Sequence, residues 1–344
     1  MKAWVSCKSE PTFKLNRKGL ILGLLGFAAF CAFFISRGIG EVLGLLREAG
    51  WLLVPLALWH LVPLAFDTLA WRSVLRGENG QRIGLARLFG IRWTGESINA
   101  LLPVFSIGGE VYKLSRVTAH SIALTSAAAS IVVDTTLALL SEILFVVCGI
   151  AVLASLHDNA SLPQGLAAGV AIAATVAALV FVVQRGHLFE QLARVLAKIG
   201  LGEAWLKQLG NLRQLDARIH ALHQDPVALF RCFLARFAAW TLGTGEVWLG
   251  LQVLGHPISL LEAFALESLC QAVRTAGFAV PGALGVQEGG YILIGRYFGL
   301  DDSTALALSL ARRVRDLVLG VPALAVWQFS ASKRLLGKKP SEKV

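Results

Sequence analysis

Ionisable side chains occur inside stretches of the chain that are otherwise apolar. Arg274 and Glu288 lie in RTAGFAVPGALGVQEGGY, and Arg312, Arg313 and Asp316 lie in LARRVRDLVLG. The other charged residues in apolar surroundings are Asp67, Glu110, Asp134, Glu142, Glu246, Glu267 and Arg296. Guanidinium groups bind anionic ligands, and carboxylates bind polar groups or carry protons. Taken together, these residues favour a polar binding site or pathway over a purely structural role.

The energetic cost of these charges indicates that they face one another. An ionisable residue at the centre of a bilayer costs about 2.5–3.5 kcal/mol on insertion scales. The predicted substrate-binding residues are Arg274, Arg312, Arg313, Glu288, Glu110, Asp134, Glu267 and Asp316. The spacing also allows Asp316 to pair with Arg312 or Arg313 within one helix. For any single residue, the alternative is a buried ion-pair network that serves only stability.

Two of the glutamates belong to segments with the same layout. NALLPVFSIGGEVY covers residues 99–112, and FAVPGALGVQEGGY covers residues 278–291. In each segment a glutamate follows a proline by seven residues, and a further ionisable residue follows the glutamate by 24. Proline and glycine interrupt helices, so the predicted helix-breaking residues are Pro103, Gly108, Gly109, Pro281, Gly282 and Gly285. A tight loop without any function is the alternative, but it would not need the glutamates.

The composition indicates a membrane protein. Of the 344 residues 56% are hydrophobic and only 16% are charged, whereas soluble domains carry about 25% charged residues. A transmembrane helix needs about 20 apolar residues. The predicted spans are 20–36, 51–71, 121–155, 165–184, 227–254 and 303–330, of which the third is too long for one straight span. The net charge of +10 gathers at the ends and in a few segments. This distribution indicates that the basic residues set the membrane topology and contact anionic lipid headgroups, rather than bind nucleic acid.

Basic residues predict the orientation of the spans, because cytoplasmic loops are rich in Lys and Arg. The N-terminal basic residues, the run from Arg72 to Arg92, and the run from Lys333 to Lys343 all predict cytoplasmic segments. Both termini are therefore expected inside. In this topology residues 88–119 begin and end inside, and residues 258–302 begin and end outside. Each stretch must enter and return, as a re-entrant hairpin or as two short spans.

The predicted fold class is an all-α polytopic membrane protein with about six full transmembrane helices and two broken helical hairpins. Hairpins of one layout that enter from opposite faces are expected of an inverted repeat. Residues 1–344 form one integral membrane domain, with halves at 88–155 and 258–330. Helical spacing of apolar residues in 186–224 predicts an amphipathic segment at the cytoplasmic surface. We expect it to brace the membrane surface; a regulatory or partner-binding role is the alternative.

Motifs for covalent chemistry are missing from the sequence. No HExxH, GxSxG, Walker A or Rossmann glycine pattern occurs in a supporting context. The five cysteines are scattered without a CxxC pair, which argues against a disulfide framework or a metal site. His60 is the one histidine within a predicted span, and we expect it to serve packing. The sequence therefore predicts no cofactor and no enzymatic activity.

The segments that carry the charges resemble a known family. ESLCQAVRTAGFAVPGALGVQEGGY and ALALSLARRVRDLVLGVPALAVWQ resemble the lysylphosphatidylglycerol-synthase transmembrane (flippase-like) family, and within it the hopanoid-biosynthesis-associated branch. NALLPVFSIGGEVYKLSRV followed by SIVVDTT is similar to the first-half motif of that family. The family often has an arginine soon after this glutamate and an Asp-Arg pair later. In this sequence Lys113 or Arg116 takes the place of the first arginine, and Asp134-Thr135 takes the place of the Asp-Arg pair. The role of the arginine in that pair is therefore not assigned to any residue of this sequence.

The resemblance spans about residues 10–332 and implies a multi-pass protein of the bacterial inner membrane that handles lipid. Only 14 residues follow the last predicted span, so we expect no soluble aminoacyl-transferase domain and no aminoacylation. The main hypothesis is a flippase that moves a hopanoid or another polar-headed lipid. In it Arg274, Arg312 and Arg313 hold the headgroup, while Glu110 and Glu288 order the hairpin tips or carry a coupling proton. The alternatives are a lipid-binding scaffold that organises biosynthetic enzymes and, less favoured, a membrane-embedded lipid-modifying enzyme.

Overall fold

The fold is described from a computed structural model. It describes residues 47, 50–77, 80–102, 108–156, 212–277, 280, 283 and 285–336. The predicted spans 20–36 and 165–184 lie outside these residues, as do Pro103, Pro281, Gly282 and most of the amphipathic segment 186–224. The described part of the chain is helical and contains no strand.

The helices follow one another with short connections. In chain order they are the 3₁₀ turn η1 (Gly50–Leu52), α3 (Leu53–Trp59), α4 (Leu61–Val74), α5 (Leu85–Leu101), α6 (Gly108–Thr118), α7 (Leu124–Leu156), α11 (Leu212–His223), α12 (Pro226–Val253), α13 (Leu260–Ala276), α14 (Val286–Gly295), the turn η3 (Arg296–Phe298) and α15 (Asp302–Leu336). Both stretches predicted to be interrupted are indeed split into two helices, α5 and α6 in one case and α13 and α14 in the other.

Among the described residues, three helical segments are long and apolar enough to cross a membrane. They are Val54–Val74, Leu124–Leu156 and Pro226–Val253, close to three of the predicted spans. The 33 residues of α7 form one unbroken helix. At 1.5 Å per residue this helix is about 50 Å long, more than the hydrocarbon core of a bilayer. A helix also covers the predicted span 303–330, but its charges between Arg312 and Asp316 keep α15 out of this apolar group.

The break between α3 and α4 has a local cause. Pro63 lacks the backbone N–H that would bond to the carbonyl of Trp59, one helical turn earlier. The chain therefore turns at His60 before α4 continues. The interruption places the imidazole of His60 beside the other charged groups described below.

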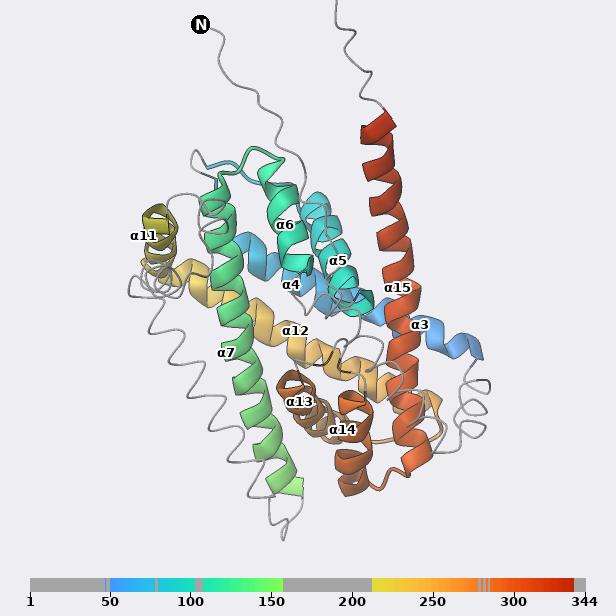
Figure 1. The fold of residues 1–344 in the computed structure, drawn as a ribbon. Coiled ribbons are helices and arrows are strands. Elements are labelled where there is room, and N and C mark those ends of the chain that lie inside the picture. Colours follow the sequence, from blue (N-terminus) through green and yellow to red (C-terminus); the bar gives the residue numbers. More distant parts are fainter. Residues whose placement is uncertain are drawn as a thin grey trace, which may run out of the picture.

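The two helix pairs lie at opposite ends of the molecule (Figure 1). Helices α4 and α12 pack along each other and cross obliquely between the pairs, while α7 and α15 run along opposite sides. Helix α7 packs against α13, and α15 packs against α5, so each long helix contacts the pair in the other half of the sequence. The described fold is therefore interleaved and not divided into two separate halves.

Apolar packing forms two main clusters. One joins α12 to α13, α14 and α15 through residues such as Leu251, Leu266 and Leu306. The other joins α4, α5, α7 and α11 through residues such as Trp71 and Val133. Exposed apolar side chains, including Leu58, Val147, Phe230, Leu293 and Val321, cover the outside of the helices. An apolar exterior is what a lipid environment requires.

The start of α12 is fixed by a side-chain cap. Asp225 accepts a hydrogen bond from the backbone N–H of Ala228 at 2.9 Å, and Arg76 Nη1 lies 2.8 Å from Asp225 Oδ2. The Ala228 hydrogen bond, aided by the Arg76 charge, holds the pKa of Asp225 below its ordinary value. Because proline is well tolerated in the first turn, Pro226 can follow the cap directly.

Glycine allows α5 and α6 to pack closely. The backbone N–H of Gly109 donates to Asn99 Oδ1 at 2.7 Å. A Cβ atom at Gly109 would overlap the carbonyl oxygen of Gly95 and the side chain of Asn99. Neither the Gly95 carbonyl nor the bonded amide can move without separating the two helices.

Substitution of Gly109 with alanine is expected to destabilise this helix pair. Overpacking of this kind costs about 1–3 kcal/mol, which thermal unfolding of the detergent-purified protein would show as a lower Tm. Gly289 is the matched control, since a Cβ atom there has no neighbour within 4 Å. Alanine at 289 is expected to leave the Tm unchanged or raise it. Equal Tm values for the two variants would contradict the close approach of α5 and α6.

Candidate functional site

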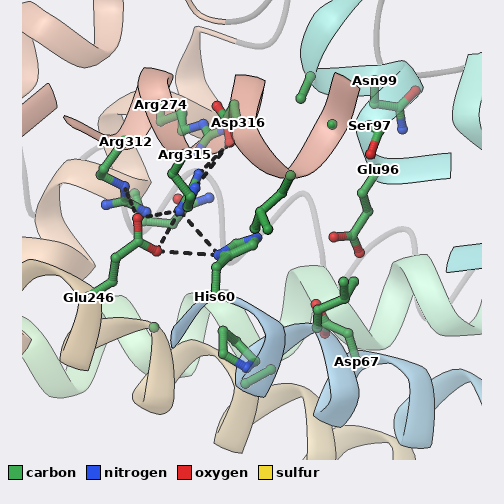
Figure 2. Close-up of a pocket in the computed structure, with 18 of the residues that line it drawn as sticks. His60, Asp67, Glu96, Ser97, Asn99, Glu246, Arg274, Arg312, Arg315 and Asp316 are labelled. Atoms are coloured by element: carbon green, nitrogen blue, oxygen red, sulfur yellow. Dashed lines mark hydrogen bonds and ion pairs between the residues drawn. The ribbon is translucent and has the colours of Figure 1, made fainter. Parts of the chain in front are cut away.

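A cavity of about 460 Å³ lies among the helices. Its walls come from α4, α5, α12, α13 and α15, together with His60 and the connection from α13 to α14. Its ionisable lining residues are His60, Asp67, Arg92, Glu96, Arg236, Glu246, Glu267, Arg274, Arg312, Arg313, Arg315 and Asp316. Figure 2 shows Arg274, Arg312 and Arg315 gathered on one side, with Glu96 and Asp67 on the other.

Asp134 on α7 joins three helices behind one wall of this cavity. Arg92 Nη1 on α5 donates to Asp134 Oδ2 at 2.9 Å, and Arg236 Nε on α12 donates to Asp134 Oδ1 at 3.1 Å. Arg236 Nη1 also reaches Asp67 Oδ1 on α4 at 2.5 Å, and Arg92 Nε reaches Glu96 Oε1 at 2.9 Å. The Asp134 side chain is 2% exposed. A buried carboxylate is costly without paired cations, so the two arginines stabilise its charge.

A second cluster joins Arg312 on α15 to Glu267 on α13. Here the long helix carries the arginine, whereas in the Asp134 cluster the long helix carries the carboxylate. Arg312 Nη2 donates to Glu267 Oε1 at 2.9 Å, and Nη1 contacts Glu267 Oε2. The hydroxyl of Tyr291 on α14 donates to Glu267 Oε2 at 2.8 Å and also contacts Arg312. This cluster ties the second helix pair to α15, much as Asp134 ties α5 to α7.

Arg315 forms a third cluster between α12 and α15. Its Nη1 atom lies 2.5 Å from both carboxylate oxygens of Glu246, and its Nη2 atom lies 2.6 Å from Asp316 Oδ1. His60 Nδ1 lies 3.3 Å from Glu246 Oε2. The predicted pairing of Asp316 with Arg312 or Arg313 was wrong, because those two arginines point to Glu267 and Glu288 on other helices.

The two hairpin glutamates occupy the same place in their helices. Glu110 is the third residue of α6, and Glu288 is the third residue of α14. Glu288 Oε2 accepts from the backbone N–H of Gly285 at 2.7 Å, and Oε1 lies 3.3 Å from Arg313 Nε and 3.2 Å from Ser309 Oγ. Glu110 instead pairs with Lys113 Nζ at 2.6 Å within α6.

The glycines predicted to break helices stand at helix starts. Gly108 and Gly109 are the first two residues of α6. Gly285 directly precedes α14 with φ +80°, in the left-handed region that favours glycine. The left-handed conformation of Gly285 lets the chain turn into α14, and the hydrogen bond from Gly285 N–H to Glu288 holds that turn.

Arg274 differs from the other arginines of the cavity. No hydrogen bond or ion pair joins its guanidinium to another side chain in the part of the chain described. Arg312 Nε and Arg313 Nη2 are buried without a hydrogen-bond partner among the described residues, but Arg312 Nε lies 3.6 Å from Glu246 Oε1 in an ion pair. The negative charge that acts on Arg274 is Asp316, which is already bonded to Arg315. Arg274 is therefore a guanidinium of the cavity to which no carboxylate of the described residues is bonded.

The structure brings most of the sequence-predicted residues together. Arg274, Arg312, Arg313, Glu267 and Asp316 line the cavity. Asp134 and Glu288 lie one layer behind it and bond to lining arginines, while Glu110 faces Lys113 and is not among the lining residues.

Other members of the site were missed. Arg92 was assigned to a cytoplasmic loop; this was wrong, because its side chain is only 5% exposed and bonds to Asp134. Arg236 and Arg315 were not singled out, and His60 contacts Glu246 instead of serving packing alone. The i, i+4 spacing of Arg92 and Glu96, and an arginine within the apolar run FLARFAAW, were signals that could have found two of them.

Comparison with known proteins identifies the family. The family described as "Lysylphosphatidylglycerol synthase TM region" matches residues 20–323. The chain belongs to this family. It is also similar to a "UPF0104 membrane protein" of Methanothermobacter thermautotrophicus (strain Delta H), with 26% identity over 94% of this chain and 100% of that protein. No solved structure matches the chain. Membership of this family and the apolar helices together establish a helical membrane protein.

Proposed function

We propose that this protein is a lipid transporter that moves a polar-headed lipid across the bacterial inner membrane. The observation that carries the proposal is the unpaired guanidinium of Arg274 in a cavity among membrane helices. A buried or half-buried charge without a partner is costly. An anionic headgroup entering the cavity would supply the missing partner.

The size of the cavity fits a headgroup better than a whole lipid. Its volume of about 460 Å³ lies within the range of small-molecule sites, roughly 300–1,000 Å³. The acyl chains or a polycyclic body such as that of a hopanoid would remain among the apolar outer surfaces of the helices. Arg274 holds the headgroup in this proposal, while Arg312 and Arg313, which also line the cavity, add positive charge beside it.

An inverted repeat would give the cavity access to both sides of the membrane. Its support lies in the packing: α5 contacts α15 in the way that α13 contacts α7, and α4 contacts α12 between them. Glu110 and Glu288, each third in its helix, would order the two hairpin tips. The proposed topology has six full spans with both termini inside, and small shifts of the two helix pairs would open the cavity alternately.

Transport accounts for the charges better than catalysis does. Most of the carboxylates of the site are bonded to arginines, which leaves them poorly suited to act as a nucleophile or general base. We therefore propose that the chain is not an enzyme and needs no cofactor. Its partners would be membrane lipids and not nucleic acid.

Reconstitution into liposomes tests this proposal. Phosphatidylglycerol carrying a fluorescent acyl chain is placed in both leaflets, and a membrane-impermeant reductant quenches the outer leaflet. Liposomes containing the protein are expected to lose nearly all fluorescence, while protein-free liposomes retain the inner half. Labelled phosphatidylcholine, whose headgroup is zwitterionic, is expected to move more slowly. Binding of the lipid without movement would favour the scaffold hypothesis, and a covalently altered lipid would favour an enzyme.

A further inference from the structure

Glu142 is a buried carboxylate that the proposed transport mechanism does not use. It lies on α7 and is 8% exposed. Its Oε1 atom accepts hydrogen bonds from the hydroxyl of Thr275 and from Gln271 Nε2, the latter at 3.4 Å. Thr275 and Gln271 are on α13, line the cavity and flank Arg274 along that helix. Glu142 therefore lies directly behind the cavity wall that carries the unpaired arginine.

No cation in the described part of the chain pairs with Glu142. Within the described residues neither Lys, Arg nor His forms an ion pair with it, unlike Asp134, Glu246, Glu267 and Glu288. The charged group of α13 that acts on it is Arg274, at longer range. A carboxylate in this setting is stabilised only by two neutral donors, and burial without a paired cation favours the protonated acid.

Among the described residues, the other helices packed against α7, which are α4, α6, α11 and α12, place no charge that acts on Glu142. From α12, the indole of Trp240 bonds to the carbonyl of Ala138. Helix α4 meets α7 near Ser130, and α11 meets it through the apolar cluster around Val133. The charges of the Asp134 cluster lie two turns along α7, about 12 Å away at 1.5 Å per residue. Within the described part of the chain, Arg274 is thus the charge that can influence protonation of Glu142.

We propose that Glu142 is a proton-binding site coupled to the occupancy of Arg274, so that an anionic headgroup and a proton bind together. While Arg274 is free, its positive charge favours the ionised form of Glu142. An anion bound to Arg274 cancels that field, and Glu142 then takes up a proton. Linkage makes the effect reciprocal, so protonation of Glu142 tightens binding of the anion by the same factor.

The hydrogen bonds around Glu142 suit such an exchange. A hydroxyl is both a donor and an acceptor, so Thr275 can donate to the carboxylate or accept from the carboxylic acid. Gln271 Nε2 lies 3.2 Å from Thr275 Oγ1 and can donate to this oxygen whether Glu142 is ionised or protonated. The proton can therefore be gained or lost without separating α7 from α13.

The inference rests on the proposed function in one respect, that Arg274 receives an anionic headgroup. Its test is the binding of dihexanoyl phosphatidylglycerol to the detergent-purified full chain by titration calorimetry. The phosphodiester stays singly ionised throughout, so any proton taken up belongs to the protein. Titration in two buffers of different ionisation enthalpy counts that proton in the wild type. Glu142→Gln, which keeps the shape of the protonated acid, is the comparison variant, and its Tm is recorded beside that of the wild type.

The wild type is expected to take up a proton on binding and to bind about tenfold more weakly at high than at low pH, within the usual range of coupling between sites. Glu142→Gln is expected to bind equally at both pH values, with the affinity that the wild type shows at low pH. Proton uptake that persists in Glu142→Gln would overturn the inference. Binding by the wild type without proton uptake would also overturn it, while leaving the transport proposal intact.

A water-soluble probe separates the two proposals further. Glycerophosphoglycerol presents the same anion without acyl chains. If it binds as tightly as the lipid and with the same proton uptake, the proton site is supported and the lipid assignment of the proposed function fails. If the wild type binds neither probe, Arg274 is not an anion site, and the proton inference falls with it.

Discussion

Replacing Arg274 with glutamine is expected to slow lipid translocation by about tenfold to a hundredfold. A hydrogen bond to a charged group is worth about 1.5–3 kcal/mol, and each 1.4 kcal/mol is about a factor of ten. The amide of glutamine keeps a polar side chain in the cavity but removes the positive charge. The initial rate of fluorescence loss in the liposome assay measures the effect.

The same substitution is expected to leave the protein folded. Arg274 has no ion pair to lose within the described structure, so glutamine exposes no orphaned carboxylate. Arg296 provides a matched control, because its side chain is 57% exposed and its pair with Asp302 lies away from the cavity. Arg296→Gln should transport at the wild-type rate. An Arg274→Gln variant with wild-type Tm and wild-type transport would rule out Arg274 as the headgroup ligand.

Replacing Asp134 with asparagine is expected to destabilise the protein by about 3–5 kcal/mol, the usual cost of breaking a buried ion pair. The substitution removes the carboxylate shared by Arg92 and Arg236, which are 5% and 7% exposed. Glu96 and Asp67 remain bonded to these arginines, which should hold the loss near the lower end of that range. Thermal unfolding in detergent is the measurement.

Arg296→Gln is again the control for stability. It breaks an exposed ion pair, and such pairs contribute about 0–1 kcal/mol. A double substitution, Asp134→Asn with Arg236→Gln, is expected to recover part of the lost Tm, since it leaves one fewer arginine uncompensated. If Asp134→Asn and Arg296→Gln lowered the Tm equally, the Asp134 cluster would not be the link between α5, α7 and α12 that its geometry indicates.

The sequence determined the features of this protein that depend on neighbouring residues. Hydropathy located α7 and α12 to within a few residues, because a membrane-spanning helix needs about 20 predominantly apolar residues in succession. The proline–glycine segments predicted where α5 and α13 end and where α6 and α14 begin, because helix breaks arise from the local backbone. The equal spacing of Pro103 from Glu110 and Pro281 from Glu288 also predicted that the two glutamates hold matching positions, and each is the third residue of its helix.

The partner of each charge was decided only by the tertiary structure. Asp316 had two arginines at helical spacing on α15, yet it bonds to Arg315, because Arg312 and Arg313 reach carboxylates on α13 and α14. Arg92 was interpreted as a loop charge, but in the structure its side chain bonds to Asp134 on α7. Spacing along one helix says which residues share a face, but not which other helix that face meets. For the same reason, only the packing of α13 against α7 and of α15 against α5 could single out Arg274 as unpaired and place Glu142 behind it.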